Sequence, residues 1–287
     1  LPATRSAVAT SLTSDLAAIS RWAKRWLVTF NAGKTETLIL SKKHDMTSFR
    51  KNPLDEDGRF MRNPQACPHP PVYFNGVELP ESPSFVVVGV TYTGNLSWDP
   101  HVRKVASKGR QALGMLSRAR FVLSKRSLAL LYKSHVRSTM EYCCATWAGA
   151  GSAALSLLDK VQEHATKLLG HAAADLPSLS HRRGVVTLAR MHRLVHGNAP
   201  APVVAFCPPR APPPARISRH SAAPFLLPPV RKLLTPAYWL RSFVPLATEA
   251  WNGLSPALQT EPDVIIFKNR LNLTSLPLCL SNLGNVE

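Results

Sequence analysis

Acidic residues are scarce in this chain of 287 residues. It has 17 Asp and Glu against 35 Lys and Arg, which gives a formal net charge of +18 and a pI near 10.3. The imbalance is concentrated in two tracts without a carboxylate, 101–140 and 176–248, each with ten Lys or Arg. Such tracts favour a nucleic-acid partner over a membrane surface, because no basic stretch carries a wide aromatic face.

Cysteines and long apolar runs are also in short supply. The five cysteines are irregularly spaced and none forms a Cys-x-x-Cys pair, so neither a zinc ribbon nor a disulfide framework is expected. A reducing intracellular compartment, nuclear or cytoplasmic, fits this pattern. No run of 18 apolar residues is present to span a membrane. The chain starts at Leu1 without a signal-peptide pattern, which suggests a piece of a longer reading frame.

Familiar catalytic signatures are incomplete. The triplet 33–35, Gly-Lys-Thr, ends like a phosphate loop, but Val28 stands where that loop needs its first glycine. His192 and His196 have the spacing of a zinc-protease pair. Arg193 replaces the glutamate that such a protease uses as its base, so these are expected to be surface histidines.

Two further candidates have structural interpretations. The run 55–59, Asp-Glu-Asp-Gly-Arg, begins like a calcium loop, but its glycine comes too early, so an acidic loop is expected. Cys143 and Cys144 fall at a buried helix end, with no neighbour that would activate a thiol. The sequence contains no evident catalytic constellation of its own.

The first hundred residues mix helix and strand signals. Apolar residues at helical spacing predict a helix over 12–27, and β-prone runs predict a short strand over 37–41 and a buried strand over 85–94. An Asn-Gly pair between two β-prone runs predicts a hairpin over 72–79. The proline-containing, polar stretch 42–71 is expected to be a loop.

Helix signals dominate after residue 100. Amphipathic helices are expected over 101–120, 127–142, 152–169 and 181–196. Ser152 is the expected N-cap of the third helix, and Gly170 lies just past its end. Ten of the 25 prolines fall within 199–230, which is expected to be a linker or extended arm before a small compact tail.

The segment 15–41 closely resembles part of the reverse transcriptases of non-LTR retrotransposons. In that family a helix of the form Asp-Leu-x-x-Ile-x-x-Trp runs into Phe-Asn-x-x-Lys-Thr and then a short strand. The matching positions here are Asp15, Leu16, Ile19, Trp22, Trp26, Phe30, Asn31, Lys34 and Thr35.

Later blocks resemble the same family in the same order. Residues 73–102 are similar to its hairpin block, with Val88 where the family usually has leucine before glycine. Four further segments resemble its helical thumb and the end of its reading frames: 131–147, 158–169, 179–200 and 241–259. The likeness therefore covers nearly the whole chain.

The resemblance implies an α+β fold. Residues 1–100 would be the end of a polymerase palm with a small antiparallel sheet, and 101–198 a helical thumb-like region. Residues 199–230 would be a Pro-rich linker, and 231–287 a small helical C-terminal segment. The implied partners are an RNA template and a DNA primer, with no membrane and no small-molecule cofactor site in this chain.

The implied activity is RNA-directed DNA polymerisation, but this chain alone is expected to be inactive. The family's palm holds two Mg²⁺ ions with paired aspartates in a Phe/Tyr-x-Asp-Asp strand, and no Asp-Asp pair exists in this sequence. In the family that strand lies upstream of the helix that matches 12–27. Mg²⁺ is therefore expected only with an upstream palm.

Lys34 is the candidate catalytic residue. In related polymerases a lysine in this motif lies near the triphosphate, where it could protonate the departing pyrophosphate. The alternative is a lysine at a strand start, with Thr35 as a local cap and Asn31 fixing the turn. Trp22 and Trp26 could stack on bases, but their spacing on an amphipathic helix favours a place in the core.

A basic helix face is the candidate contact with nucleic acid. A thumb grips the phosphate backbone of a template–primer duplex, which needs charge without sequence readout. The residues expected to do this are Arg103, Lys104, Lys108, Arg110, Arg118, Lys125 and Arg126. Two alternatives stay open: a non-catalytic remnant that acts as a basic nucleic-acid-binding module, and a protein whose Pro-rich arm docks onto a polyproline-reading domain.

Overall fold

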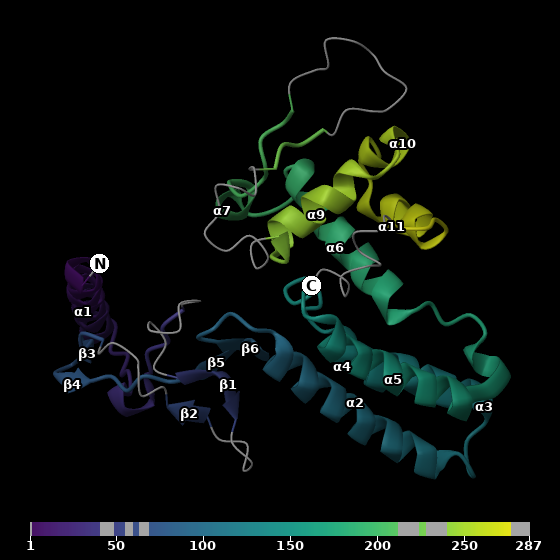
Figure 1. Cartoon of the computed structure of the whole chain (residues 1–287), viewed down its shortest axis with the longest axis horizontal. Coiled ribbons are helices and arrows are strands. Elements are labelled where there is room, and N and C mark those ends of the chain that lie inside the picture. Colours follow the sequence, from purple (N-terminus) through teal and green to yellow (C-terminus); the bar gives the residue numbers. More distant parts are fainter. Residues whose placement is uncertain are drawn as a thin grey trace. The chain divides into compact units, whose positions relative to one another are not determined.

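The chain divides into two compact units, Leu1–Trp98 and Asp99–Glu287. The computed structural model describes residues 2–40, 49–54, 60–62, 69–211, 224–227 and 240–276. In the first unit a long helix accompanies antiparallel strands, and the second unit is mainly helical (Figure 1). This mixture of helix and antiparallel sheet is compatible with the predicted α+β class.

Antiparallel strands of the first unit form two-stranded pairs. The pairs are β1 (Phe49–Leu54) with β2 (Phe60–Arg62), β3 (Tyr73–Phe74) with β4 (Val77–Glu78), and β5 (Ser84–Val87) with β6 (Val90–Thr93). The loop predicted over 42–71 is therefore wrong where β1 and β2 form. A two-stranded ribbon consists only of edge strands, which tolerate a proline such as Pro53.

The hairpin predicted over 72–79 is confirmed. Asn75 and Gly76 connect β3 to β4, with φ angles of 52° and 79°. Positive φ at both central residues is what a two-residue hairpin turn requires. Phe74 pairs with Val77 across the turn and is buried.

The single buried strand predicted over 85–94 is wrong. The chain reverses at Val88 and Gly89, whose φ angles are 47° and 78°, so β5 and β6 form a second hairpin. Val90 is buried, but Val86 is largely exposed. The run of valines concealed the turn because a β-branched residue rarely adopts positive φ.

The strand predicted over 37–41 is wrong for the residues that the structure describes there. Thr37 forms only an isolated bridge with Glu81. The Thr37 N–H donates to the carbonyl of Pro80 over 2.9 Å, and the Ser82 N–H donates to the Thr37 carbonyl over 2.8 Å. Pro80 has no N–H with which to extend this pairing into a ladder.

α1 (Pro2–Arg25) begins ten residues before the helix predicted over 12–27. It contacts the first hairpin through Thr13 and Ser20. The Thr13 hydroxyl accepts the Tyr73 N–H over 3.2 Å, and the Ser20 hydroxyl donates to the Asn75 side-chain oxygen over 2.6 Å. These contacts determine which side of α1 faces the β3–β4 hairpin.

The expectation that Trp22 and Trp26 belong to the core is wrong. Their side chains are 52 % and 62 % exposed, with ring centroids 6.5 Å apart. The buried side of α1 carries Ala9 and Ala23. At 100° per residue, the tryptophans lie roughly 100° around the helix from that side. Periodicity correctly indicated an amphipathic helix, but the side of α1 that packs against the rest of the unit is not the side that carries the tryptophans.

Helices of the second unit form where the sequence predicts them. They are α2 (Asp99–Ala119), the continuous rod of α3 (Lys125–Leu131), η3 (Tyr132–Arg137) and α4 (Ser138–Glu141), then α5 (Ser152–Leu169), η4 (Gly170–Ala173) and α6 (Leu179–Val195). Gly170 ends α5 with a φ of 60°, as predicted. The N-cap of α5 is Gly151, so the assignment of that role to Ser152 is wrong by one residue.

The middle of the α3–α4 rod is a π-helix. Buried residues recur there every four positions, at Leu128, Tyr132, Val136 and Met140. On an α-helix a spacing of four drifts about 40° per step, so these side chains would spiral off one face. The wider π turn returns them to the same side. All four therefore share the core that the rod forms with α2 and α5.

A second core joins α6 to the C-terminal helices. These are α9 (Phe243–Asn252), α10 (Pro256–Gln259) and α11 (Val264–Asn272). Its buried members include Val185, Leu188, Met191, Leu246, Trp251, Phe267 and Leu271. The ring centroids of Trp251 and Phe267 lie 5.5 Å apart. The compact tail expected from the sequence is thus part of the α6 core.

Only part of the arm predicted over 199–230 lies among the described residues. That part contains the short helix α7 (Ala201–Val204) and an antiparallel bridge between Arg210 and Phe225. The Asn252 side chain accepts the Phe225 N–H over 3.2 Å and donates to its carbonyl over 2.9 Å. Phe225 is buried, so this point of the arm is fixed to the second core.

The prediction of surface histidines is wrong for His192. Its side chain is completely buried, and its ring centroid lies 4.6 Å from that of Phe267. His192 Nε2 lies 2.7 Å from the Glu261 carbonyl oxygen, and its ring lies 4.3 Å from that of His196. His192 is buried because α11 packs against this side of α6, and His196 is partly buried beside it.

His192 should make the stability of the second unit depend on pH. Burial lowers its pKa below the usual 6.5, and His196 lowers it further. The unfolded chain then binds more protons below pH 6.5, so stability falls as the pH drops from 6.5 towards the folded-state pKa. We expect His192→Gln to flatten this dependence in urea unfolding between pH 7 and pH 5. An equal slope in the natural chain and in His192→Gln would contradict the prediction.

Candidate nucleic-acid interface

α2 carries apolar and basic side chains on opposite sides. Its buried residues include Val102, Val105, Leu113 and Leu116, and the helix packs against α5 and the α3–α4 rod. Five exposed cations lie on an arc of about 160° on the other side, at 100° per residue: Arg103, Lys104, Lys108, Arg110 and Arg118. These five residues are called the basic face of α2.

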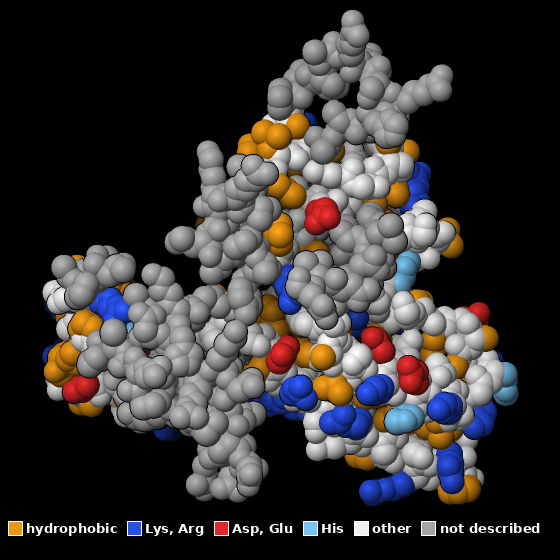
Figure 2. All heavy atoms as spheres, in the orientation of Figure 1, with side chains coloured by type: hydrophobic (Ala, Val, Ile, Leu, Met, Phe, Trp, Pro, Cys, Tyr) orange, Lys and Arg blue, Asp and Glu red, His pale blue; other side chains and the backbone are white. Residues whose placement is uncertain are grey.

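The basic face of α2 is not neutralised by neighbouring carboxylates. Within the part of the chain that the structure describes, the ion pairs involve only Arg137, Arg182 and Arg270 with Glu141 and Glu261. Figure 2 shows Lys and Arg side chains gathered over the region where α2 to α5 lie. Unpaired exposed cations along one helix create a positive potential that attracts polyanions.

The positive charges of the basic face also affect a buried histidine of α2. His101 lies under the first turns of the helix, with its ring centroid 5.9 Å from that of Trp147. Burial lowers the pKa of His101, and the positive charges of Lys104 and Lys108 lower it further. The two lysines therefore oppose protonation of His101.

Lys125 and Arg126 are exposed in the first turn of α3. The Lys125 ammonium donates to the carbonyl of Leu168 over 2.5 Å, so it caps the C-terminal end of α5. Cations at a helix N-terminus oppose the helix dipole, and this interaction with the negative end of α5 offsets that cost for Lys125. Lys125 thus has a structural role, whereas no ion pair among the described residues engages Arg126.

Sequence reasoning missed two residues beside this face. Arg120 is exposed in the loop after α2, and its guanidinium carbon lies 4.6 Å above the centroid of the Phe121 ring. Phe121 falls between the predicted helices, where helical periodicity gives no signal, and Arg120 is the last residue of the helix predicted over 101–120, one residue past the observed end of α2. The absence of acids from 101–140 was the available indication that Arg120 belongs with the basic face.

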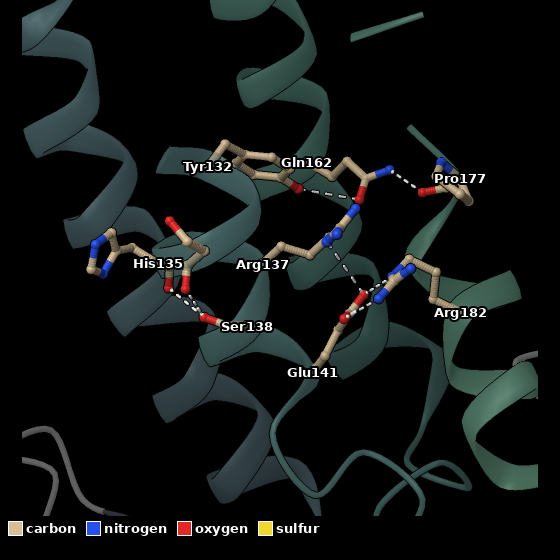
Figure 3. Close-up of polar contacts among 9 residues, drawn as sticks. Tyr132, His135, Arg137, Ser138, Glu141, Gln162, Pro177 and Arg182 are labelled. Atoms are coloured by element: carbon tan, nitrogen blue, oxygen red, sulfur yellow. Dashed lines mark hydrogen bonds and ion pairs between the residues drawn. The ribbon is translucent and has the colours of Figure 1, made fainter. Parts of the chain in front are cut away.

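A polar network fastens the α3–α4 rod to α5 and α6 (Figure 3). The Tyr132 hydroxyl donates to Gln162 Oε1 over 3.2 Å, and Gln162 Nε2 donates to the Pro177 carbonyl over 3.0 Å. Arg182 donates through Nε and Nη2 to the two carboxylate oxygens of Glu141. These bonds hold the helical layer beneath the basic face together.

Several ionisable groups in this helical layer are buried, and burial shifts their pKa values. Burial raises the pKa of Tyr132 to about 12 and that of the Cys144 thiol to about 11. Arg183 is buried near Asp159, and burial raises the pKa of that carboxyl while Arg183 opposes the shift. Cys144 is buried as predicted, whereas Cys143 is exposed with a φ of 51°.

Lys34 lies at the end of η1 (Ala32–Lys34) in the first unit, and its side chain is exposed. The Asn31 carbonyl accepts both the Lys34 N–H, over 3.1 Å, and the Thr35 hydroxyl, over 3.0 Å. The Asn31 side chain makes no capping bond, so Asn31 fixes this turn through its backbone alone. Thr35 thus caps the turn locally, as the structural alternative for this segment expects.

Neither a metal-binding cluster nor a membrane-spanning helix is found among the described residues. No group of three or more His, Cys, Asp or Glu side chains there could hold a metal ion. The acidic run 55–59 lies outside the described residues, as do Cys67 and Cys279. None of the described helices combines the length and the apolar character needed to cross a bilayer.

Comparison with known proteins adds no relative. No protein-family model, curated protein or solved structure matches the chain.

Proposed function

We propose that this chain is the C-terminal part of a non-LTR retrotransposon reverse transcriptase and that the basic face of α2 grips the template–primer duplex. The observation that carries the proposal is the row of five exposed cations on α2, unpaired among the described residues and backed by the packed helices α3 to α5. The ordered sequence blocks that resemble this polymerase family supply the identity of the parent enzyme.

The arrangement suits phosphate contacts without base readout. The basic face runs from Arg103 to Arg118, a distance of 15 residue steps along one helix, which is about 22 Å at 1.5 Å per residue. Such a row can follow a phosphate backbone, and contacts of this kind position a duplex but carry no sequence information. In this proposal residues 1–100 are the end of the palm, 101–198 are the thumb, and Mg²⁺ binds with an upstream palm.

The chain itself has no pair of adjacent aspartates to hold catalytic metals. Its own biochemical property is therefore duplex binding, and Lys34 would act on the triphosphate only within an intact polymerase. A non-catalytic remnant would keep the same binding property, because that property needs only the second unit. The frame upstream of Leu1 distinguishes the two, since a working enzyme needs a Phe/Tyr-x-Asp-Asp strand there.

Binding should depend steeply on salt. Each phosphate that a cation neutralises releases counterions, so the logarithm of the affinity falls with the logarithm of salt concentration, with a slope of roughly −0.9 per contact for B-form DNA. Four to six contacts predict a slope between about −4 and −5. Fluorescence anisotropy with a labelled RNA–DNA hybrid across a potassium chloride series measures it. A nearly flat plot would rule out phosphate contacts as the basis of binding.

A further inference from the structure

The loop between α2 and α3 presents two of the most exposed apolar side chains of the second unit. Phe121 is 81 % exposed and Val122 is 86 % exposed. The backbone of this loop is nevertheless well fixed. The N–H groups of Val122 and Leu123 both donate to the Ala119 carbonyl, over 3.1 and 3.0 Å. Phe121 and Val122 are called the apolar tip.

Cations flank the apolar tip in the sequence, and one of them contacts it. Arg118 precedes it on α2, and Arg126 follows it on α3; both are exposed. The Arg120 guanidinium lies over the Phe121 ring at 4.6 Å, and Lys125 ties the loop to the end of α5. No Asp or Glu occurs anywhere in 101–140. The tip is thus an exposed apolar projection on a hydrogen-bonded loop at the end of the basic face of α2.

We propose that the apolar tip inserts between stacked bases of the duplex that the basic face of α2 holds, an inference that rests on the proposed function. Proteins that kink or unstack a duplex do so with apolar wedges such as phenylalanine set among cations that hold the adjacent phosphates. The tip has this composition, and its position at the end of α2 places it in continuity with the phosphate contacts.

A lipid surface suits the tip less well. Interfacial binding to membranes relies on a broad apolar helix face opposite a basic one. Here the apolar side of α2 is buried against α5 and the α3–α4 rod, which leaves the side chains of one loop to enter the membrane. An insertion between two base pairs needs only one flat ring, which Phe121 provides.

A base-unstacking assay on the full chain tests the inference. RNA–DNA hybrids would carry the fluorescent adenine analogue 2-aminopurine at successive positions of the DNA strand. We expect binding to raise its fluorescence at one or two adjacent positions, where the tip separates the bases. The double variant Phe121→Ala/Val122→Ala should lose this rise and bind roughly tenfold more weakly, the equivalent of one lost stacking interaction. Its salt slope should stay unchanged, because no phosphate contact is lost.

The controls separate this inference from the proposed function. Leu273→Ala removes another exposed apolar side chain and should keep both the fluorescence rise and the affinity. A rise that survives in the double variant, or no rise when the natural chain is bound, overturns insertion by the tip and leaves phosphate binding intact. Failure of the natural chain to bind any hybrid overturns both. Binding to vesicles of phosphatidylcholine and phosphatidylserine that is lost in the double variant would assign the tip to membranes instead.

Discussion

Reversing two charges on the basic face of α2 should nearly abolish duplex binding. Lys104→Glu/Lys108→Glu removes two phosphate attractions and adds two repulsions on a helix face where no carboxylate now competes. We expect affinity for an RNA–DNA hybrid at low salt to fall roughly 100-fold or more, at about 1.4 kcal/mol or more for each reversed charge. The salt slope should also become shallower by about 2. Anisotropy titrations at several salt concentrations measure both quantities.

The matched control reverses two other cations. Arg190 and Arg193 are exposed on α6, and no ion pair among the described residues involves them. Arg190→Glu/Arg193→Glu changes the net charge by the same amount and should weaken binding far less. Equal losses in the two double variants would show that binding follows net charge, and the basic face of α2 would lose its assigned role.

Replacing the buried Trp251 by alanine should severely destabilise the second unit. The side chain is 1 % exposed and belongs to the second core, where its ring centroid lies 6.1 Å from that of His192 and 5.5 Å from that of Phe267. A buried tryptophan replaced by alanine costs about 3–5 kcal/mol, from lost burial and the cavity that remains. Urea unfolding followed by far-ultraviolet circular dichroism should show a lower midpoint for Trp251→Ala.

The first unit supplies a control with the same chemical change. Trp22→Ala removes an exposed ring, so we expect a change within about 0.5 kcal/mol. A loss of several kcal/mol for Trp22→Ala would mean that this ring is covered in solution. A small loss for Trp251→Ala would mean that α9 does not pack on α6 as the structure has it.

Periodicity predicted the helices well because their buried faces repeat along the sequence. α2, the α3–α4 rod, α5 and α6 each begin and end within about two residues of the expected bounds, since local caps and glycine mark their ends. The Asn75–Gly76 hairpin was predictable for a similar reason, as those residues tolerate positive φ. Signals of this kind reside in neighbouring residues and need no knowledge of the rest of the fold.

The wrong predictions concern features that depend on contacts between residues far apart in the sequence. Whether Trp22 is buried depends on which side of α1 meets the first hairpin, and His192 is buried because α11 packs against α6. Val88 adopts positive φ because β5 and β6 pair around it. For the candidate interface, the cations of α2 were predictable from composition and periodicity, whereas the projection of Phe121 depends on how two helices meet.

The π-helix of the α3–α4 rod also bears on how this chain would align with homologues. Leu128 and Met140 lie 12 positions apart, which on a plain α-helix would put them about 120° out of line. With one residue fewer between them, the spacing of 11 falls within about 20° of three full turns. The segment Tyr132–Arg137 therefore behaves as a one-residue insertion absorbed within a single turn. A one-residue gap at this place in a homologous chain would leave Glu141 opposite Arg182 and the surrounding packing undisturbed.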